Sequence, residues 1–339
     1  MTLNDIWFIL FVVIIAGYLI LDGFDLGVGI VHLLVAKTDL DRRLLLNSIG
    51  PIWDGNEVWL VVGGGVLFAA FPLAYASLFS GLYLAMMLVL LFLILRTVAI
   101  EFRSKREAPG WRKLWDIVFF VSSLSIALLF GVTFGNIIAG VPLDGQGNIH
   151  ISLFELLTPF PLLVGITAVA MMAMHGCIYL IMKTGDALQA RLKKWTPRFM
   201  VLFFILNTLV VLSVFLFQDQ TMENYSSTIL LGVFPTIALV TLVVAWWMVR
   251  SERYFNAFVA SSAMIALLLF SGAIGVYPNL LISTIDPANN LTINNAASAT
   301  NTLQVMLVIA LIGMPFVLAY TAGVYYFFRG KTELTAESY

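Results

Sequence analysis

The sequence VWLVVGGGVLFAAFPLAYASLFSGLYLAMMLVLLFLIL, residues 58–95, runs for 38 residues without a charged side chain. As one α-helix it would be about 57 Å long at about 1.5 Å per residue, almost twice the hydrocarbon thickness of a bilayer, about 30 Å. The stretch therefore predicts two membrane-spanning helices. Pro72 is the expected turn between them, because proline ends a helical run.

The composition of the whole chain agrees with a membrane protein. Of the 339 residues, 61% are hydrophobic and only 11% are charged, whereas soluble domains carry about 25% charged residues. The net charge of −1 gives no basic footprint for nucleic acid. A single cysteine, Cys177, excludes an intramolecular disulfide and any site built from several cysteines.

Charge-free runs elsewhere bring the prediction to nine transmembrane helices. Besides the two in residues 58–95, the predicted spans are residues 6–35, 117–138, 157–181, 199–217, 229–249, 255–277 and 303–328. A backbone surrounded by lipid must satisfy its own hydrogen bonds, so we expect an all-α polytopic membrane protein without a sheet.

The basic residues predict the orientation of these spans. All 18 Lys and Arg fall on one side of the nine-span arrangement. Because basic loops stay in the cytoplasm, the N-terminus is expected outside and the C-terminus inside the cell. The first residues lack the basic segment of a signal peptide, so the first span is expected to be retained.

A weak internal repeat suggests how the spans are grouped. LLFGVTFGN at residues 128–136 and LLFSGAIGVYPN at residues 268–279 both end predicted outward-running spans on asparagine. This favours two four-helix units, residues 1–140 and 141–279. Residues 280–339 then supply an external loop, a peripheral ninth helix and a cytoplasmic tail. The loop is expected to be either an ordered cap or a flexible connector.

Two carboxylates lie inside the first predicted span. Asp22 and Asp25 are three residues apart and share one helix face, which continues through Gly29 and His32 and should contact other helices. Ionisable groups within a membrane are costly and are therefore candidates for function. The alternative is that both carboxylates simply reach water at the cytoplasmic end of the span.

Three further ionisable residues are expected at the same depth. Asp54 and Glu57 enter the second span, where they could instead form a helix capping box, and Arg96 ends the third span. Arg96 either holds the carboxylates ionised or extends to the lipid headgroups. Five ionisable groups at the inner end of one bundle resemble the entrance of a proton-uptake path.

The chain is poor in metal ligands. Its only histidines are His32, His150 and His175, and His150 falls in an external loop. This excludes a haem-copper site, which needs several histidines on membrane helices. His175 lies among methionines and is expected to be a packed neutral histidine, so no metal or cofactor is expected on this chain.

Three stretches in the first third of the chain resemble subunit II of the cytochrome bd-type quinol oxidases. They are DGFDLGVG at residues 22–29, NSIGPIWDGNEVWL at 47–60 and EFRSK at 101–105. The resemblance implies one subunit of a heterodimeric enzyme of the prokaryotic cytoplasmic membrane. That enzyme oxidises quinol near the outer face, reduces O2 to water with protons from inside and so generates proton-motive force.

The resemblance also implies where the cofactors and the proton path lie. Haems b558, b595 and d are ligated by the partner, subunit I. In the family, the residues that match Asp25 and Asp54 line a proton path. The resemblance implies that Arg96 tunes these two carboxylates, and that Glu57 and Asp22 are further members of the path. The resemblance leaves open whether this chain binds a structural quinone and whether the complex contains a small single-helix accessory subunit.

Two alternatives of other classes remain at this point. Carboxylates in spans and a repeat also fit a proton- or cation-coupled secondary transporter, although the sequence lacks helices broken at the midplane. The chain could also be a scaffold that stabilises its partner and carries no protons. Turnover after replacement of Asp54 separates the scaffold from the proton path.

Overall fold

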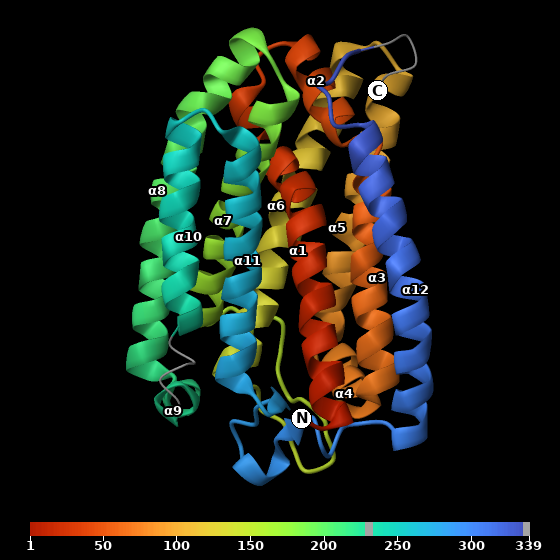
Figure 1. Ribbon diagram of the computed structural model, residues 1–339, viewed down its shortest axis with the longest axis vertical. Helices are drawn as coiled ribbons and strands as arrows, with labels where there is room; N and C mark the ends of the chain where they lie inside the picture. The colour runs from red at the N-terminus through yellow and green to blue at the C-terminus, as the bar shows by residue number, and fades with distance from the viewer. Residues whose placement is uncertain (228–232, 335–339) are drawn as a thin grey trace.

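The computed structural model describes residues 1–227 and 233–334, and consists of long helices that run side by side (Figure 1). Within these residues, eight helices are long and apolar enough to cross a membrane, and a bent helix pair adds a ninth if it counts as one span. They lie close to the predicted spans, so the chain is a multi-pass membrane protein. The predicted start at residue 229 and the tail residues 335–339 lie outside the described part. The eight are α1 (Leu3–Val35), α5 (Tyr83–Phe102), α6 (Pro109–Ala139), α7 (Pro159–Lys183), α8 (Asp186–Phe217), α10 (Val233–Arg250), α11 (Tyr254–Val276) and α12 (Thr300–Phe327).

The bent pair is the stretch predicted to turn at Pro72. Helix α3 (Trp53–Ala70) is followed by α4 (Pro72–Gly81), and the two are bent by 120°. The break at Pro72 is confirmed, but a ten-residue helix follows it where the sequence suggested only a short turn. Proline is well suited to the first position of a helix, where no N–H is needed. The third span therefore begins at Tyr83.

The prediction of no sheet is wrong in one extramembrane loop. Strands β1 (Asn279–Leu281) and β2 (Leu291–Thr292) pair antiparallel around the short 3-10 helix η3 (Pro287–Asn289). Here the chain lies between α11 and α12, so backbone groups freed from helices bond to one another. The Ser298 N–H donates to the Ala70 carbonyl at 2.9 Å. Of the two expectations for this loop, the ordered cap is the one the structure shows.

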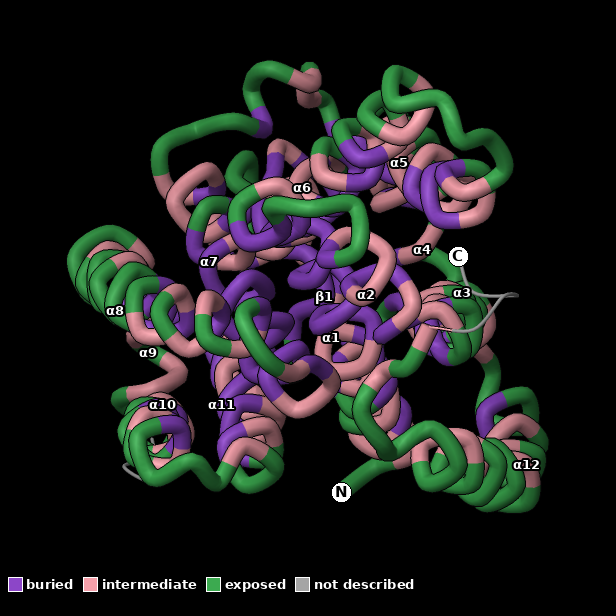
Figure 2. The backbone as a smooth tube through the Cα atoms, turned by 90° about the horizontal axis from the view of Figure 1, so that it is seen from above, coloured by how far each residue is buried: buried purple, intermediate pink, exposed green. Residues whose placement is uncertain are grey.

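Helices α1 and α7 form the centre of the bundle, and α12 stands at its edge (Figure 2). Gly27 of α1 faces Gly176 of α7 so closely that a Cβ on Gly27 would lie 2.8 Å from the Gly176 Cα. Small residues allow such close approach of helix backbones in membranes. In α12, by contrast, Leu303 is the only buried residue.

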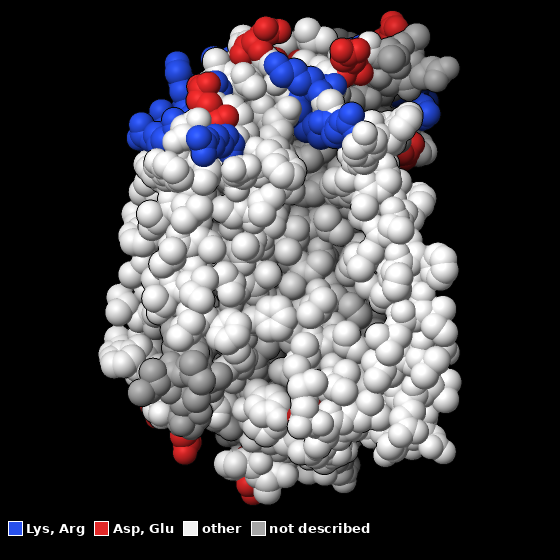
Figure 3. Space-filling model, in the orientation of Figure 1, with Lys and Arg blue, Asp and Glu red and all other residues white. Residues whose placement is uncertain are grey.

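The lysine and arginine residues gather at one end of the molecule, which we call the basic end. It is the end where α1, α5, α7 and α10 finish, and it carries the visible Lys and Arg in Figure 3. A short helix that the sequence did not predict, α2 (Asp39–Ile49), lies there. The short helix α9 (Asp219–Ser227), also not predicted, lies at the opposite end.

Asp41 holds α2 in place. Its carboxylate accepts the N–H groups of Lys37 and Thr38 at 2.9 and 3.0 Å, and it pairs with Arg191 of α8 at 2.5 Å. Burial acts to raise the pKa of Asp41, but these donors outweigh it and hold the pKa below the ordinary value of 3.8. The link between α2 and α8 therefore depends on an ionised Asp41.

Replacing Asp41 with Asn is expected to lower the free energy of unfolding by about 1 kcal/mol near pH 7, because the capping box of α2 and the ion pair with Arg191 are both weakened. A carboxylate with a lowered pKa in the folded state stabilises above its unfolded pKa and loses this contribution as the pH falls through the folded pKa. The natural chain should therefore lose this stability below about pH 3.8, and the variant should lack that loss. Thermal unfolding between about pH 3 and pH 7 measures both, and parallel curves for the two proteins would contradict the expectation.

Candidate functional site

A buried ion cluster joins α1, α3 and α5. Arg96 of α5 is only 1% exposed, and its Nη2 lies 2.7 Å from Oδ1 of the fully buried Asp22 on α1. The same Nη2 lies 3.1 Å from Oε2 of Glu57 on α3, whose side chain is 20% exposed. Arg96 therefore does not extend to the headgroups, and that alternative is wrong. One guanidinium holds two carboxylates from two other helices.

Asp25 lies beside this cluster and is held by an amide. Asn56 of α3 donates its Nδ2–H to Asp25 Oδ2 at 2.8 Å and to the Leu21 carbonyl at 3.3 Å. The Asn56 Oδ1 accepts the hydroxyl of Tyr325 from α12 at 2.8 Å. Asp25 is 1% exposed and Asp22 is fully buried, so neither of these two carboxylates reaches bulk water, and the alternative that both do is wrong. Asn56 thus connects Asp25 to α3 and α12.

Asp54 lies apart, exposed in the first turn of α3. Within the described residues no hydrogen bond or ion pair reaches its carboxylate. The capping-box alternative is wrong, because α3 begins at Trp53 with Ile52 as its N-cap and without a side-chain cap. Glu57 is thereby free to reach Arg96. The structure brings Asp22, Glu57 and Arg96 together and leaves Asp54 at the surface near them.

Several buried polar atoms of the site have no protein partner among the described residues. They are Tyr18 Oη, Asp22 Oδ2, Asp25 Oδ1, Arg96 Nε and Arg96 Nη1. Leaving such atoms unsatisfied costs about 1–3 kcal/mol each, and bound water is their ordinary partner. In addition, Arg96 pairs with Asp22 and Glu57 but not with the neighbouring Asp25, so full ionisation of the three carboxyl groups would leave buried negative charge uncompensated. The site suits the uptake and release of a proton.

Sequence reasoning missed a second buried network, centred on Asp116 of α6. His32 Nε2 lies 2.7 Å from Asp116 Oδ1, Arg103 Nε lies 2.6 Å from the same oxygen, and Arg42 Nη1 of α2 lies 2.8 Å from Oδ2. The predicted contact of the Gly29–His32 face with another helix is confirmed. Asp116 could not be found from the sequence, because it immediately precedes a predicted span and looks like a solvated helix end.

The histidines do not form a ligand set for haem or metal. Both ring nitrogens of His175 are engaged, with Ser261 Oγ at 2.8 Å and the Ile20 carbonyl at 3.1 Å, and the ring stacks on Phe258. His150 lies in an exposed loop beside Asp144, and its hydrogen bond lowers the pKa of that carboxyl. Within the part of the chain that is described, no group of three or more His, Cys, Asp and Glu could hold a metal ion.

Comparisons with known proteins cover nearly the whole chain. Residues 3–328 match the family model described as cytochrome bd terminal oxidase subunit II. The chain is 36% identical over 333 residues to cytochrome bd ubiquinol oxidase subunit 2 of Bacillus subtilis (strain 168), covering 98% of this chain and 97% of that one. It is 33% identical over 359 residues to cytochrome bd-I ubiquinol oxidase subunit 2 of Escherichia coli (strain K12), covering 97% and 95%.

A solved structure shares the fold. The bd oxidase from Geobacillus thermodenitrificans contains a chain that superposes with a TM-score of 0.80 at 17% sequence identity, covering 97% of this chain and 99% of that chain. At this identity the likeness concerns the fold alone. The family model and the full-length relatives carry the assignment, and the chain belongs to the cytochrome bd terminal oxidase subunit II family.

Proposed function

We propose that this chain is the subunit of a bd-type quinol oxidase that supplies part of the proton-uptake path from the cytoplasm. The observation that carries the proposal is the ion cluster in which Arg96 joins the partly exposed Glu57 to the buried Asp22, with Asp25 beside it. Reduction of O2 to water consumes protons, so a route for them through the membrane interior is required. Family membership supports this reading over a secondary transporter.

The path begins at the basic end and runs inward. Asp54 is exposed and collects protons from solvent, and Glu57, one helical turn further along α3, is partly exposed. Arg96 connects Glu57 to the buried Asp22. Asp25 lies one turn from Asp22 on α1, and bound water between the unpartnered oxygens of these two carboxyls would complete the chain of groups.

The same proposal assigns the other parts of the enzyme. The haems b558, b595 and d lie in the partner, subunit I, which agrees with the occupied nitrogens of His175. Quinol and O2 are substrates of the complex and not of this chain alone. The basic end faces the cytoplasm of a prokaryotic cell and the N-terminus faces outward. The two four-helix units with a peripheral ninth helix remain the proposed grouping of spans.

Replacing Asp25 with Asn is expected to lower quinol-dependent oxygen uptake at least tenfold, because a positioned acid–base group contributes about 100-fold or more. Asp54→Asn should lower oxygen uptake less than Asp25→Asn does, because solvent water can partly replace the exposed Asp54 carboxylate as a proton donor. The tagged chain is purified from native membranes with its partner, and a haem spectrum with a subunit gel normalises the rates.

Asp186→Asn is the matched control, because Asp186 is an exposed carboxylate at the same end and lies outside the cluster. Its left-handed backbone, with φ of 48°, is one that asparagine tolerates. Normal turnover of both Asp25→Asn and Asp54→Asn would favour the scaffold alternative and remove the proton path.

A further inference from the structure

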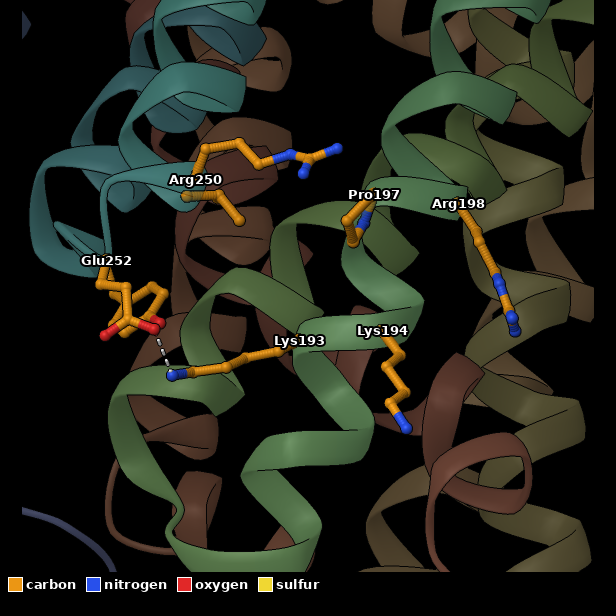
Figure 4. Close-up of a pocket in the computed structure, with 8 residues that line it drawn as sticks. Lys193, Lys194, Pro197, Arg198, Arg250 and Glu252 are labelled. Atoms are coloured by element: carbon orange, nitrogen blue, oxygen red, sulfur yellow. Dashed lines mark hydrogen bonds and ion pairs between the residues drawn. The ribbon is translucent and has the colours of Figure 1, made fainter.

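A pocket of about 350 Å³ lies at the basic end between α8 and the turn that joins α10 to α11 (Figure 4). It is far along the chain from the ion cluster of α1, α3 and α5 and shares no residue with it. The pocket is lined by Lys193, Lys194, Pro197, Arg198, Val249, Arg250, Glu252 and Tyr254.

The lining is strongly positive, with four cations and one carboxylate. Glu252 forms an ion pair with Lys193, whose Nζ lies 2.8 Å from Glu252 Oε1. Within residues 1–227 and 233–334, no carboxylate forms an ion pair with Lys194, Arg198 or Arg250. An anionic ligand would supply the charge that these three cations lack.

Aromatic rings position two of the cations. The Arg198 guanidinium lies over the Trp195 ring at 5.0 Å, and the Arg250 guanidinium lies over the Trp246 ring at 5.3 Å. A guanidinium on a ring face still has its N–H groups available for hydrogen bonds. Figure 4 shows Arg250 reaching from α10 toward Pro197 of α8, and Lys194 and Arg198 extending from α8 away from Arg250, so the three cations surround this end of α8 and do not meet at one point.

The local backbone also builds the pocket. Pro197 has no N–H, so the carbonyl of Lys193, four residues earlier, lacks its usual helix donor. Glu252 adopts the left-handed φ of 58° in a tight reversal, in which the Arg253 N–H donates to the Met248 carbonyl at 2.9 Å. This reversal places Glu252 beside Lys193 and leaves Arg250 at the pocket.

The helices leading away from the pocket are apolar and exposed. On α8, Val201 is 47% and Ile205 51% exposed, and on α10, Val243 is 64% exposed. They lie one to two turns from the pocket, on the membrane side of it. A ligand that fits both parts has an anionic head at the basic pocket and apolar tails along the helices.

We propose that this pocket binds the headgroup of an anionic phospholipid from the leaflet at the basic end. A soluble phosphate shares the headgroup chemistry, but only a lipid also covers the apolar surface below. Basic pockets between membrane helices recognise anionic headgroups in this way, and each cation near the surface contributes about fivefold in affinity. Removing the three cations should therefore weaken binding on the order of 100-fold.

The test uses the complex purified with its partner, stripped of lipid in detergent and titrated in native mass spectrometry. The probes are phosphatidylglycerol, phosphatidylcholine and inorganic phosphate. The variant combines Lys194→Gln, Arg198→Gln and Arg250→Gln. The control combines Lys105→Gln, Arg106→Gln and Lys113→Gln, which removes equal charge from exposed residues at the same end.

The complex and the control should hold one phosphatidylglycerol tightly, and the triple variant should lose it, with phosphatidylcholine bound weakly by all. Equal losses in variant and control would show a general charge effect and overturn the proposal. Phosphate that competes at the same concentration as the lipid would overturn the choice of a lipid. If the triple variant does not assemble, Lys194→Gln and Arg250→Gln alone, each expected to bind about fivefold more weakly, decide the question.

Discussion

Complexes that carry Arg96→Leu are expected to be less stable by about 3–5 kcal/mol and to be recovered from membranes in much lower yield. Removing one partner of a buried ion pair leaves the other charge uncompensated, and this costs far more than the pair contributes. Asp22 is fully buried and loses its only ion-pair partner among the described residues, and Glu57 loses its own. Thermal unfolding of the purified complex measures the change.

A second substitution shows whether the buried charge is the cause. Adding Asp22→Asn to Arg96→Leu removes the uncompensated carboxylate and should recover part of the lost stability. Arg106→Leu is the control for loss of one arginine, because Arg106 is exposed and lies over the Trp111 ring at 4.7 Å. A double variant no more stable than Arg96→Leu alone would mean that Arg96 stabilises mainly by packing.

Gly27→Leu should prevent the chain from folding into its natural bundle. A Cβ at Gly27 would lie 2.0 Å from the Met172 carbonyl oxygen and 2.8 Å from the Gly176 Cα. Both atoms belong to the backbone of α7, so neither can rotate away, and the two central helices would have to separate. We expect a loss of more than about 3 kcal/mol, at the upper end of the cost of overpacking.

Gly65→Leu is the matched control for this substitution. Gly65 lies on the exposed side of α3, and a Cβ there meets nothing within 4 Å. The amount of haem-bearing partner that co-purifies with each tagged variant gives the readout. Equal recovery of the Gly27→Leu and Gly65→Leu complexes would show that α1 and α7 are not held as closely as described.

The sequence predicted the spans well because charge and hydropathy act locally. The 38-residue run of residues 58–95 had to be divided, and the helix break falls at Pro72 as expected. The sequence did not reveal that α4 (Pro72–Gly81) is a separate helix. An apolar run has the same hydropathy pattern whether it crosses a membrane or forms a short helix at the end of a span. Strands β1 and β2 depend on pairing across a loop, which local patterns do not contain.

The sequence predicted that the ionisable residues of the candidate site lie at the same depth in the membrane, but it did not predict which of them contact one another. Helix periodicity placed Asp22 and Asp25 on one face, and the end of the charge-free run placed Arg96 near them. That Arg96 bonds to Asp22 while Asn56 bonds to Asp25 depends on the rotation of α3 and α5, which periodicity alone does not determine. Their roles in proton transfer stay predictions until turnover is measured.

The bond from Tyr325 to Asn56 has a consequence for the biogenesis of the protein. Membrane helices enter the bilayer in the order of synthesis, so α1, α3 and α5 are in place long before α12 emerges. The hydroxyl of Tyr325 reaches Asn56, and through it the surroundings of Asp25, only when this last helix docks. A nascent chain thus completes its ionisable centre at the end of translation, so a prematurely terminated chain never carries a finished one.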